Sequence, residues 1–367
     1  MNRGTARYPL LEIDLDKLKA NLAALIERCQ SLSVEVAGVV KGFSALPEAA
    51  GVYTECGVRS LASSRLSQLR ALRGAGVACE RVLIRIPMLS ELPEVAEVAD
   101  MSLQSELETL RALNAVCAKR GTRHSVILMA DLGDLREGFW SREELVDAAL
   151  EVEYKLDHLE LAGVGTNLGC YGSVAATPEK LRELVSAAEA VERAIGRELQ
   201  YISGGASTSV HMVLDGTLPA RVNHLRIGEG ILVSKDLQVD WGIHDMDYLR
   251  MDCMTLRAQI VEVKDKPTHP VGPIVVDCFC NRPTYEDRGI RRRAIAGIGR
   301  ADVGDVMMLR PRTPGMTVVG GSSDHCILDV EDCHPCPRVG DVVDFDVIYL
   351  TMLYASARED VPVVFVD

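Results

Sequence analysis

Long hydrophobic runs are missing from this sequence of 367 residues. No apolar segment approaches the roughly 18 residues of a transmembrane helix, and no basic-then-apolar segment follows Met1. Positive charge is also scarce, since 40 Lys and Arg stand against 53 Asp and Glu, giving a net charge of −13. This balance argues against nucleic acid or an anionic membrane as the main partner. We therefore expect a cytoplasmic protein whose partner is a small molecule.

The cysteines do not indicate a metal site. The sequence has 11 of them without a secretory segment, so we expect reduced thiols that mostly fill the core. Cys333 and Cys336, in "CHPC", have the spacing of a metal-binding pair. A zinc site needs four ligands, which Cys326 and His325 nearby would supply only in part. We expect no metal there.

Short apolar runs alternate with helical patterns through the first two thirds of the chain. Alternating strands and helices with mostly apolar strands are typical of a parallel sheet, and eight such units predict a (β/α)₈ barrel. The predicted strands are Val34–Lys41, Arg59–Ser64, Arg81–Ile86, Asp100–Ser105, Ser125–Asp131, Glu160–Asn167, Gln200–Gly205 and His224–Gly230. The predicted helices are Leu46–Gly57, Arg65–Gly74, Ser105–Arg120, Ser141–Tyr154 and Pro178–Ile195.

After Trp241 the pattern becomes short and rich in β-forming residues, with no convincing helix. The predicted strands here are Thr255–Val263, Ile274–Phe279, Arg293–Ile298, Thr317–Gly321, Val342–Ile348 and Val361–Val366. We therefore expect an α/β barrel at residues 10–240, followed by a C-terminal all-β domain at 248–367. The stretch Leu10–Asp14, within residues 1–15, is a candidate to pair with that β domain.

The carboxyl ends of the barrel strands carry the residues suited to chemistry, because the active site of such a barrel lies there. Lys41 ends the first strand, and Arg136 and Asn167 follow later ones. The loops "SGGAST" (Ser203–Thr208) and "LRIGEG" (Leu225–Gly230) follow the last two strands, where barrels often bind phosphate. A phosphate site opposite a lysine suits pyridoxal 5'-phosphate, which is commonly held by both.

The same motifs carry a resemblance to a known family. "VVKGFS", "GTNLGCYG", "SGGAST", "LRIGEGIL" and "EDRGIRRRAIAGIGRADV" resemble the alanine racemase-like enzymes, the fold-type III class that uses pyridoxal phosphate, and its ornithine racemase branch most. The resemblance covers nearly the whole chain. It implies a barrel followed by a β domain, and a head-to-tail homodimer with two shared active sites.

The resemblance implies a role for several of the barrel residues. Lys41 would bond covalently to the aldehyde of the cofactor, and Arg226 would face its pyridine nitrogen. Arg136 would lie near the ring hydroxyl and the substrate carboxylate, and Asn167 stands where the family has a cofactor-side histidine. The contacts to the cofactor phosphate would be made by Ser207, Thr208, Gly228 and Glu229.

The β domain would supply the other face of the site. Ser323 and Asp324, in "GGSSDHC", would contact the substrate bound to the partner subunit. The tyrosine that serves these enzymes as a second base has no counterpart, and Asp277 in "VVDCFC" stands near its position. Asp277 is either this base or the partner of a substrate ammonium group, and Cys278 is the other candidate base. A further departure is Ala45, where alanine racemases usually have a tyrosine that contacts the phosphate.

Because of these departures, we do not expect this chain to be a typical alanine racemase. We interpret the sequence as a racemase that interconverts the enantiomers of ornithine or another basic amino acid by two-base proton transfer. One alternative is a lyase of the same fold type, such as a D-amino-acid dehydratase or aldolase. Its metal-binding histidine and cysteine have no counterparts in "DFDVIYLTM". The other alternative, a non-catalytic cofactor-binding protein, does not explain the C-terminal domain.

Overall fold

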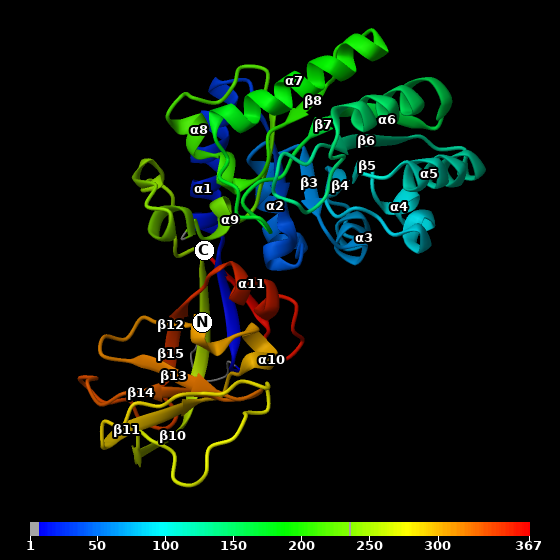
Figure 1. Cartoon of the computed structure of the whole chain (residues 1–367). Coiled ribbons are helices and arrows are strands. Elements are labelled where there is room, and N and C mark those ends of the chain that lie inside the picture. Colours follow the sequence, from blue (N-terminus) through cyan, green and yellow to red (C-terminus); the bar gives the residue numbers. More distant parts are fainter. Residues whose placement is uncertain (1–6, 235) are drawn as a thin grey trace. The chain divides into compact units, whose positions relative to one another are not determined.

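Eight short parallel strands close into a barrel in chain order, from β2 to β9, and β9 pairs with β2. The computed structural model describes residues 7–234 and 236–367 of the chain (Figure 1). The barrel strands are β2 (Glu35–Val39), β3 (Ser60–Ser63), β4 (Glu80–Leu83), β5 (Met101–Gln104), β6 (His124–Met129), β7 (Leu159–Gly165), β8 (Tyr201–Ser203) and β9 (His224–Ile227). All eight predicted strands and the predicted (β/α)₈ barrel are confirmed.

Helices α2 to α7 lie outside the barrel strands (Figure 1). The helices of this unit are α1 (Leu15–Ser31), α2 (Pro47–Glu55), α3 (Leu66–Gly74), α4 (Leu92–Val98), α5 (Leu107–Arg120), α6 (Arg142–Lys155), α7 (Pro178–Ile195), α8 (His211–Leu214) and α9 (Glu229–Leu232). The sequence does not predict α1, α4 or the short helices α8 and α9. Local sequence signals set the ends of the longer ones: Ser141 caps α6 by accepting from the N–H of Glu144 at 3.0 Å, a contact worth about 1 kcal/mol.

The core of the barrel is built from the inward residues of its strands. Most of these side chains are apolar, and among them are Val39, Leu103, Ile127 and Met129. This close packing fixes the backbone of each strand, so that the residues at the strand ends are held in place. Within the described ranges, no helix combines the length and apolar composition needed to span a membrane.

The remaining strands form a separate eight-stranded sheet. Its strands are β1 (Leu10–Asp14), β10 (Met254–Pro267), β11 (Ile290–Ala296), β12 (Arg310–Pro311), β13 (Thr317–Gly321), β14 (Cys326–Asp329), β15 (Val342–Asp346) and β16 (Val363–Val366). β1 pairs with β10 in antiparallel and with β16 in parallel orientation. The chain divides between residues 14 and 15 and again between 253 and 254, so β1 belongs to the sheet and not to the barrel.

The expected C-terminal β domain is confirmed, but one of its predicted strands is wrong. Residues 274–279 form no strand, but a connection that includes a turn, in which Val275 and Val276 are exposed. The segment has the composition of a strand, but it finds no neighbouring strand to pair with. Beside its sheet the unit also contains two short helices that the sequence did not predict, α10 (Arg300–Val303) and α11 (Tyr349–Ala355).

Candidate active site

Lys41 lies directly beyond the end of β2, in the short 3₁₀ turn Val40–Phe43, and is partly buried. Ser44 and Ala45, which follow, both have a left-handed φ of 54°. Such values are uncommon outside glycine and tend to occur at functional sites. The neighbouring strand end is close, since a Cβ atom placed on Gly228 would lie 2.9 Å from the Cβ of Val39. The barrel therefore brings the lysine turn beside the loop after β9.

Ser207 joins the two glycine-rich loops. Its hydroxyl oxygen accepts from the backbone N–H groups of Gly228 and Gly230, at 3.3 and 3.0 Å. The neighbouring Thr208 donates its hydroxyl to the carbonyl of Leu168 at 3.1 Å, which links this loop to the connection after β7. Backbone N–H groups, a hydroxyl and glycines that allow close approach are the usual components of a phosphate site. The structure brings together the predicted residues Ser207, Thr208, Gly228 and the buried Glu229.

Arg226 is only 4% exposed and is held by two neutral groups. Its guanidinium donates to the hydroxyl oxygen of Ser203 and, at 2.7 Å, to the carbonyl oxygen of Thr166. Burial lowers the pKa of Arg226 to about 10, so the guanidinium stays charged at neutral pH. Because neither partner is a carboxylate, the positive charge of Arg226 is not cancelled by a direct ion pair.

His224 supports Arg226 through Ser203. The Ser203 hydroxyl accepts from Arg226, so its own proton is available to the Nδ1 atom of His224, 2.7 Å away. This arrangement requires a neutral imidazole. Burial, with the nearby charge of Arg226, lowers the pKa of His224 to about 3. Sequence reasoning missed His224, since a histidine near the start of a strand carries no motif.

Arg136 forms a bidentate ion pair with its neighbour Glu137 in the connection between β6 and α6. The side chain of Glu137 is 14% exposed and that of Arg136 is 40% exposed. Hydrogen bonding to Glu137 raises the pKa of Arg136. The charges of both residues also act on the pKa of Arg226, Glu137 raising it and Arg136 lowering it. Glu137 is therefore an additional charge beside the predicted Arg136, and the sequence did not indicate it.

Asp134 is a second residue that the sequence analysis missed. It is 1% exposed, and its carboxylate accepts from four backbone N–H groups of the connection after β7. These donors belong to Gly169, Cys170, Tyr171 and Val174. Asp134 thus joins two connections: the one between β6 and α6, which contains Arg136, and the one between β7 and α7, which contains Asn167.

The buried side-chain nitrogen of Asn167 has no hydrogen-bond partner among the residues that the structure describes. Such a group is costly unless something binds to it, and buried polar atoms without partners are rare. Asn167 directly follows Thr166, the residue that accepts from Arg226. A phosphorylated aromatic cofactor fits this set: its phosphate suits the loops around Ser207, and a polar acceptor on it would satisfy Asn167.

The predicted residues of the β unit lie around Arg300. The Arg300 guanidinium stacks 4.4 Å from the ring centre of Phe279, and its backbone N–H donates to the carbonyl of Ser322 at 3.0 Å. Arg300 therefore connects the turn of Asp277 and Cys278 with the exposed pair Ser323 and Asp324. The hydroxyl of Ser323 donates to the carboxylate of Asp324.

Asp277 lies in a different environment from the expected one. Instead of projecting from a strand, its carboxylate accepts from the backbone N–H groups of Phe279 and Asn281, at 2.9 and 2.8 Å. These contacts, led by that from Asn281, lower the pKa of Asp277. A base near neutrality would need a raised pKa, so this environment does not favour proton transfer by Asp277. Cys278 is exposed, and the role of either residue as a base stays a prediction.

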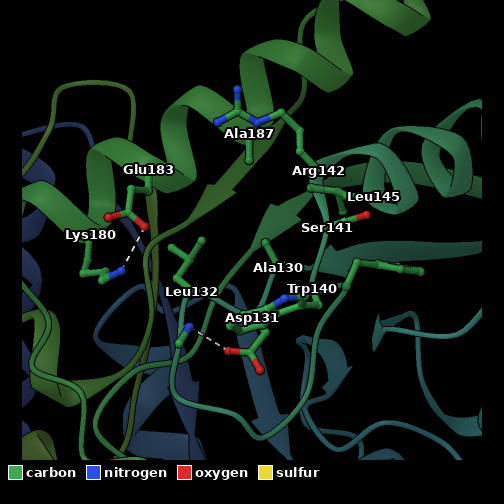
Figure 2. A pocket seen from close by; sticks show the side chains of 12 residues that line it. Ala130, Asp131, Leu132, Trp140, Ser141, Arg142, Leu145, Lys180, Glu183 and Ala187 are labelled. Carbon is green, nitrogen blue, oxygen red and sulfur yellow. Dashed lines mark hydrogen bonds and ion pairs between the residues drawn. The ribbon is translucent and has the colours of Figure 1, made fainter.

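A hollow of about 330 Å³ lies between the connection after β6 and helices α6 and α7, and Figure 2 shows the side chains that line it. Its lining mixes apolar side chains, such as Leu145 and Ala187, with the ion pair of Lys180 and Glu183, 2.9 Å between Nζ and Oε2. None of the predicted site residues lines it. The hollow is therefore a separate feature of the barrel surface.

The described residues contain no group of three or more His, Cys, Asp or Glu side chains arranged to hold a metal ion. Cys333 is buried and Cys336 is exposed, and both are free thiols.

The fold and the site together define the class of this protein. A (β/α)₈ barrel with a lysine after its first strand, glycine-rich loops after its last two, and a separate β unit is the arrangement of the alanine racemase-like class. The chain belongs to the family described as alanine racemase, N-terminal domain, which it matches over residues 13–235.

Two relatives match almost the entire chain. Ornithine racemase of Acetoanaerobium sticklandii is 38% identical over 352 residues, covering 96% of this chain and 98% of that protein. Lysine racemase of Thermotoga maritima is 32% identical over 358 residues and covers 98% of each. Among solved structures, the alanine racemase of Streptomyces lavendulae superposes with a TM-score of 0.74 at 21% identity, covering 99% of this chain and 98% of that one. This last similarity shows the fold.

Proposed function

We propose that this racemase acts on basic amino acids, with ornithine as the first substrate and pyridoxal 5'-phosphate as the cofactor. The observation that carries the proposal is the position of Lys41 at the end of β2, beside the loops that Ser207 joins. The relatives that match nearly the whole chain are named for ornithine and lysine, which supports the choice of substrate.

The barrel residues would hold the cofactor at three places. Ser207, Thr208 and the N–H groups of Gly228 and Gly230 would bind its phosphate. Arg226 would hold the ring nitrogen, and its position is set in advance by its contacts with Ser203 and Thr166. Bound pyridoxal phosphate makes the α-proton of an attached amino acid acidic.

The proton is moved by the residues of this chain. The amine of Lys41 removes it from, or returns it to, one face of Cα. Arg226 keeps its own proton, because its pKa stays well above neutrality. A guanidinium that donates a hydrogen bond to the ring nitrogen without transferring its proton would limit the delocalisation of charge into the ring, which favours prompt return of a proton to Cα. On the opposite face, Asp277 and Cys278 are the candidate groups.

We further infer that a second copy of the chain completes each site with its β unit. The connection between β10 and β11 exposes a series of apolar side chains, including Val271 at 92%, Val275 at 75% and Val276 at 49%. Exposed apolar surface of this kind is typical of an interface. A homodimer by sedimentation is expected, and a fully active monomer would contradict this part of the proposal.

The function is tested by incubating the purified protein with pyridoxal phosphate and each enantiomer of ornithine, lysine, arginine, alanine and serine. We expect racemisation of ornithine or lysine to be the fastest. Borohydride reduction of the loaded enzyme should fix the cofactor to the peptide that contains Lys41. A Lys41→Ala variant should lose this label and its activity, whereas Lys180→Ala, at the start of α7, should keep both. Label on another lysine would show that the assignment is wrong.

A further inference from the structure

Glu137 is an acidic side chain paired with an arginine of the predicted site. It forms the bidentate ion pair with Arg136, and its charge also acts on Arg226. With 14% of its side chain exposed, Glu137 is mostly removed from water. A carboxylate in such a place is costly to leave without a cationic partner.

The other two acidic residues of the same connection have different tasks. The Oδ1 atom of Asp131 accepts from the N–H groups of Gly133 and Leu135, at 2.8 and 3.1 Å. Asp134 is occupied by the four N–H groups of the next connection. Both carboxylates shape the backbone. Glu137 differs, because its partner is the side chain of Arg136, which is itself predicted to bind the substrate carboxylate.

We propose that Glu137 binds the side-chain ammonium group of the substrate while Arg136 binds its α-carboxylate. A basic amino acid brings one carboxylate and one distal ammonium group, so the internal ion pair is replaced by two ion pairs with the substrate. An amino acid with an apolar side chain would take Arg136 away from Glu137 and leave the carboxylate without a partner. This difference selects for basic substrates. The inference rests on the proposed racemase function and adds the residue that determines its specificity.

The test compares ornithine with norvaline, which has the same carbon chain without the terminal amine. In a Glu137→Gln variant, kcat/KM for ornithine should fall about 10- to 100-fold, the range expected for loss of one charged hydrogen bond. The value for norvaline should stay the same or rise. Glu143→Gln removes an equal charge from the exposed start of α6 and should change neither value.

A second variant guards against a merely structural effect. Glu137→Asp withdraws the carboxylate by one methylene, so the ratio of kcat/KM for ornithine to that for lysine, which is one methylene longer, should fall. An equal loss for ornithine and norvaline in Glu137→Gln would overturn the inference, and so would an unchanged ornithine-to-lysine ratio in Glu137→Asp. If the wild-type enzyme racemises neither basic amino acid, the proposed function itself fails, which is a separate result.

Discussion

Replacing Asp134 by alanine should release the connection between β7 and α7. The carboxylate of Asp134 is 1% exposed and accepts from four N–H groups. The distances from Gly169, Tyr171 and Val174 are 3.1, 3.0 and 3.2 Å, and that from Cys170 is 3.4 Å. Alanine removes both carboxylate oxygens, so all four N–H groups lose their acceptor.

The magnitude follows from these contacts. A hydrogen bond to a charged group contributes about 1.5–3 kcal/mol, so the three shorter contacts set an upper limit of several kcal/mol. Cys170 and Tyr171 are exposed, and their N–H groups regain part of this energy from water. A net cost of about 3 kcal/mol for local opening is therefore expected, which corresponds to about 100-fold in the equilibrium constant.

Native-state hydrogen exchange measures this opening directly. In Asp134→Ala, the amides of residues 169–174 should exchange about 100-fold faster than in the wild type, and cofactor affinity should fall because Asn167 begins the released connection. Asp134→Asn keeps one acceptor oxygen and should lose about half of the protection energy. Asp131→Asn, in the same connection as Asp134, should leave residues 169–174 unchanged. Exchange within threefold of the wild type in Asp134→Ala would refute the role of this carboxylate.

Three further predictions concern charge and proton transfer. Arg226→Glu should slow racemisation and alter the visible absorption of the bound cofactor, so an unchanged rate and spectrum would contradict its assigned contact. Burial lowers the pKa of His124 to about 4 and that of His224 to about 3. Below pH 6.5 both histidines are therefore protonated in the unfolded chain but stay neutral in the native state until the pH approaches these lower values. The free energy of unfolding, from urea titrations, should thus fall from pH 6.5 to pH 4 by roughly 3 kcal/mol per histidine, and His224→Gln should reduce the fall. Loss of the second base should abolish α-proton exchange in heavy water from one enantiomer only, and symmetrical exchange in both Asp277→Asn and Cys278→Ala would exclude both residues.

The barrel could be predicted from the sequence because its information is local. Each strand is a short buried run between a helix and a turn, and Lys41 and the glycine-rich loops lie where such strands end. Asp134 could not be recognised in this way. Its carboxylate serves N–H groups that are 35 to 40 residues later in the chain, and only the closed barrel brings the two connections together.

The second unit was harder to predict because its elements depend on tertiary partners. Residues 274–279 are rich in valine, yet β10 and β11 pair with each other and leave this connection outside the sheet. Helix α11 was also not predicted, because the aromatic and β-branched residues around Tyr349 have the composition of a strand and not of a helix. Its start is fixed locally, where the N–H of Ile348 donates to the hydroxyl oxygen of Thr351 at 3.0 Å. Composition alone does not show that cap.

Arg226 and Arg136 have hydrogen-bond partners of different kinds, and this difference fits the role proposed for each arginine. Arg226 must hold one position and keep its charge, and it is fixed by a hydroxyl and a carbonyl group that cannot neutralise it. In the proposed exchange Arg136 releases Glu137 when a substrate binds, and this partner is a side chain on the same connection. Exchange of that pair for a basic amino acid leaves both Arg136 and Glu137 with a partner of opposite charge, whereas exchange for an apolar one leaves Glu137 without a partner. Selectivity for basic substrates then follows from charge balance at Glu137, without a requirement for a closely fitting pocket around the substrate side chain.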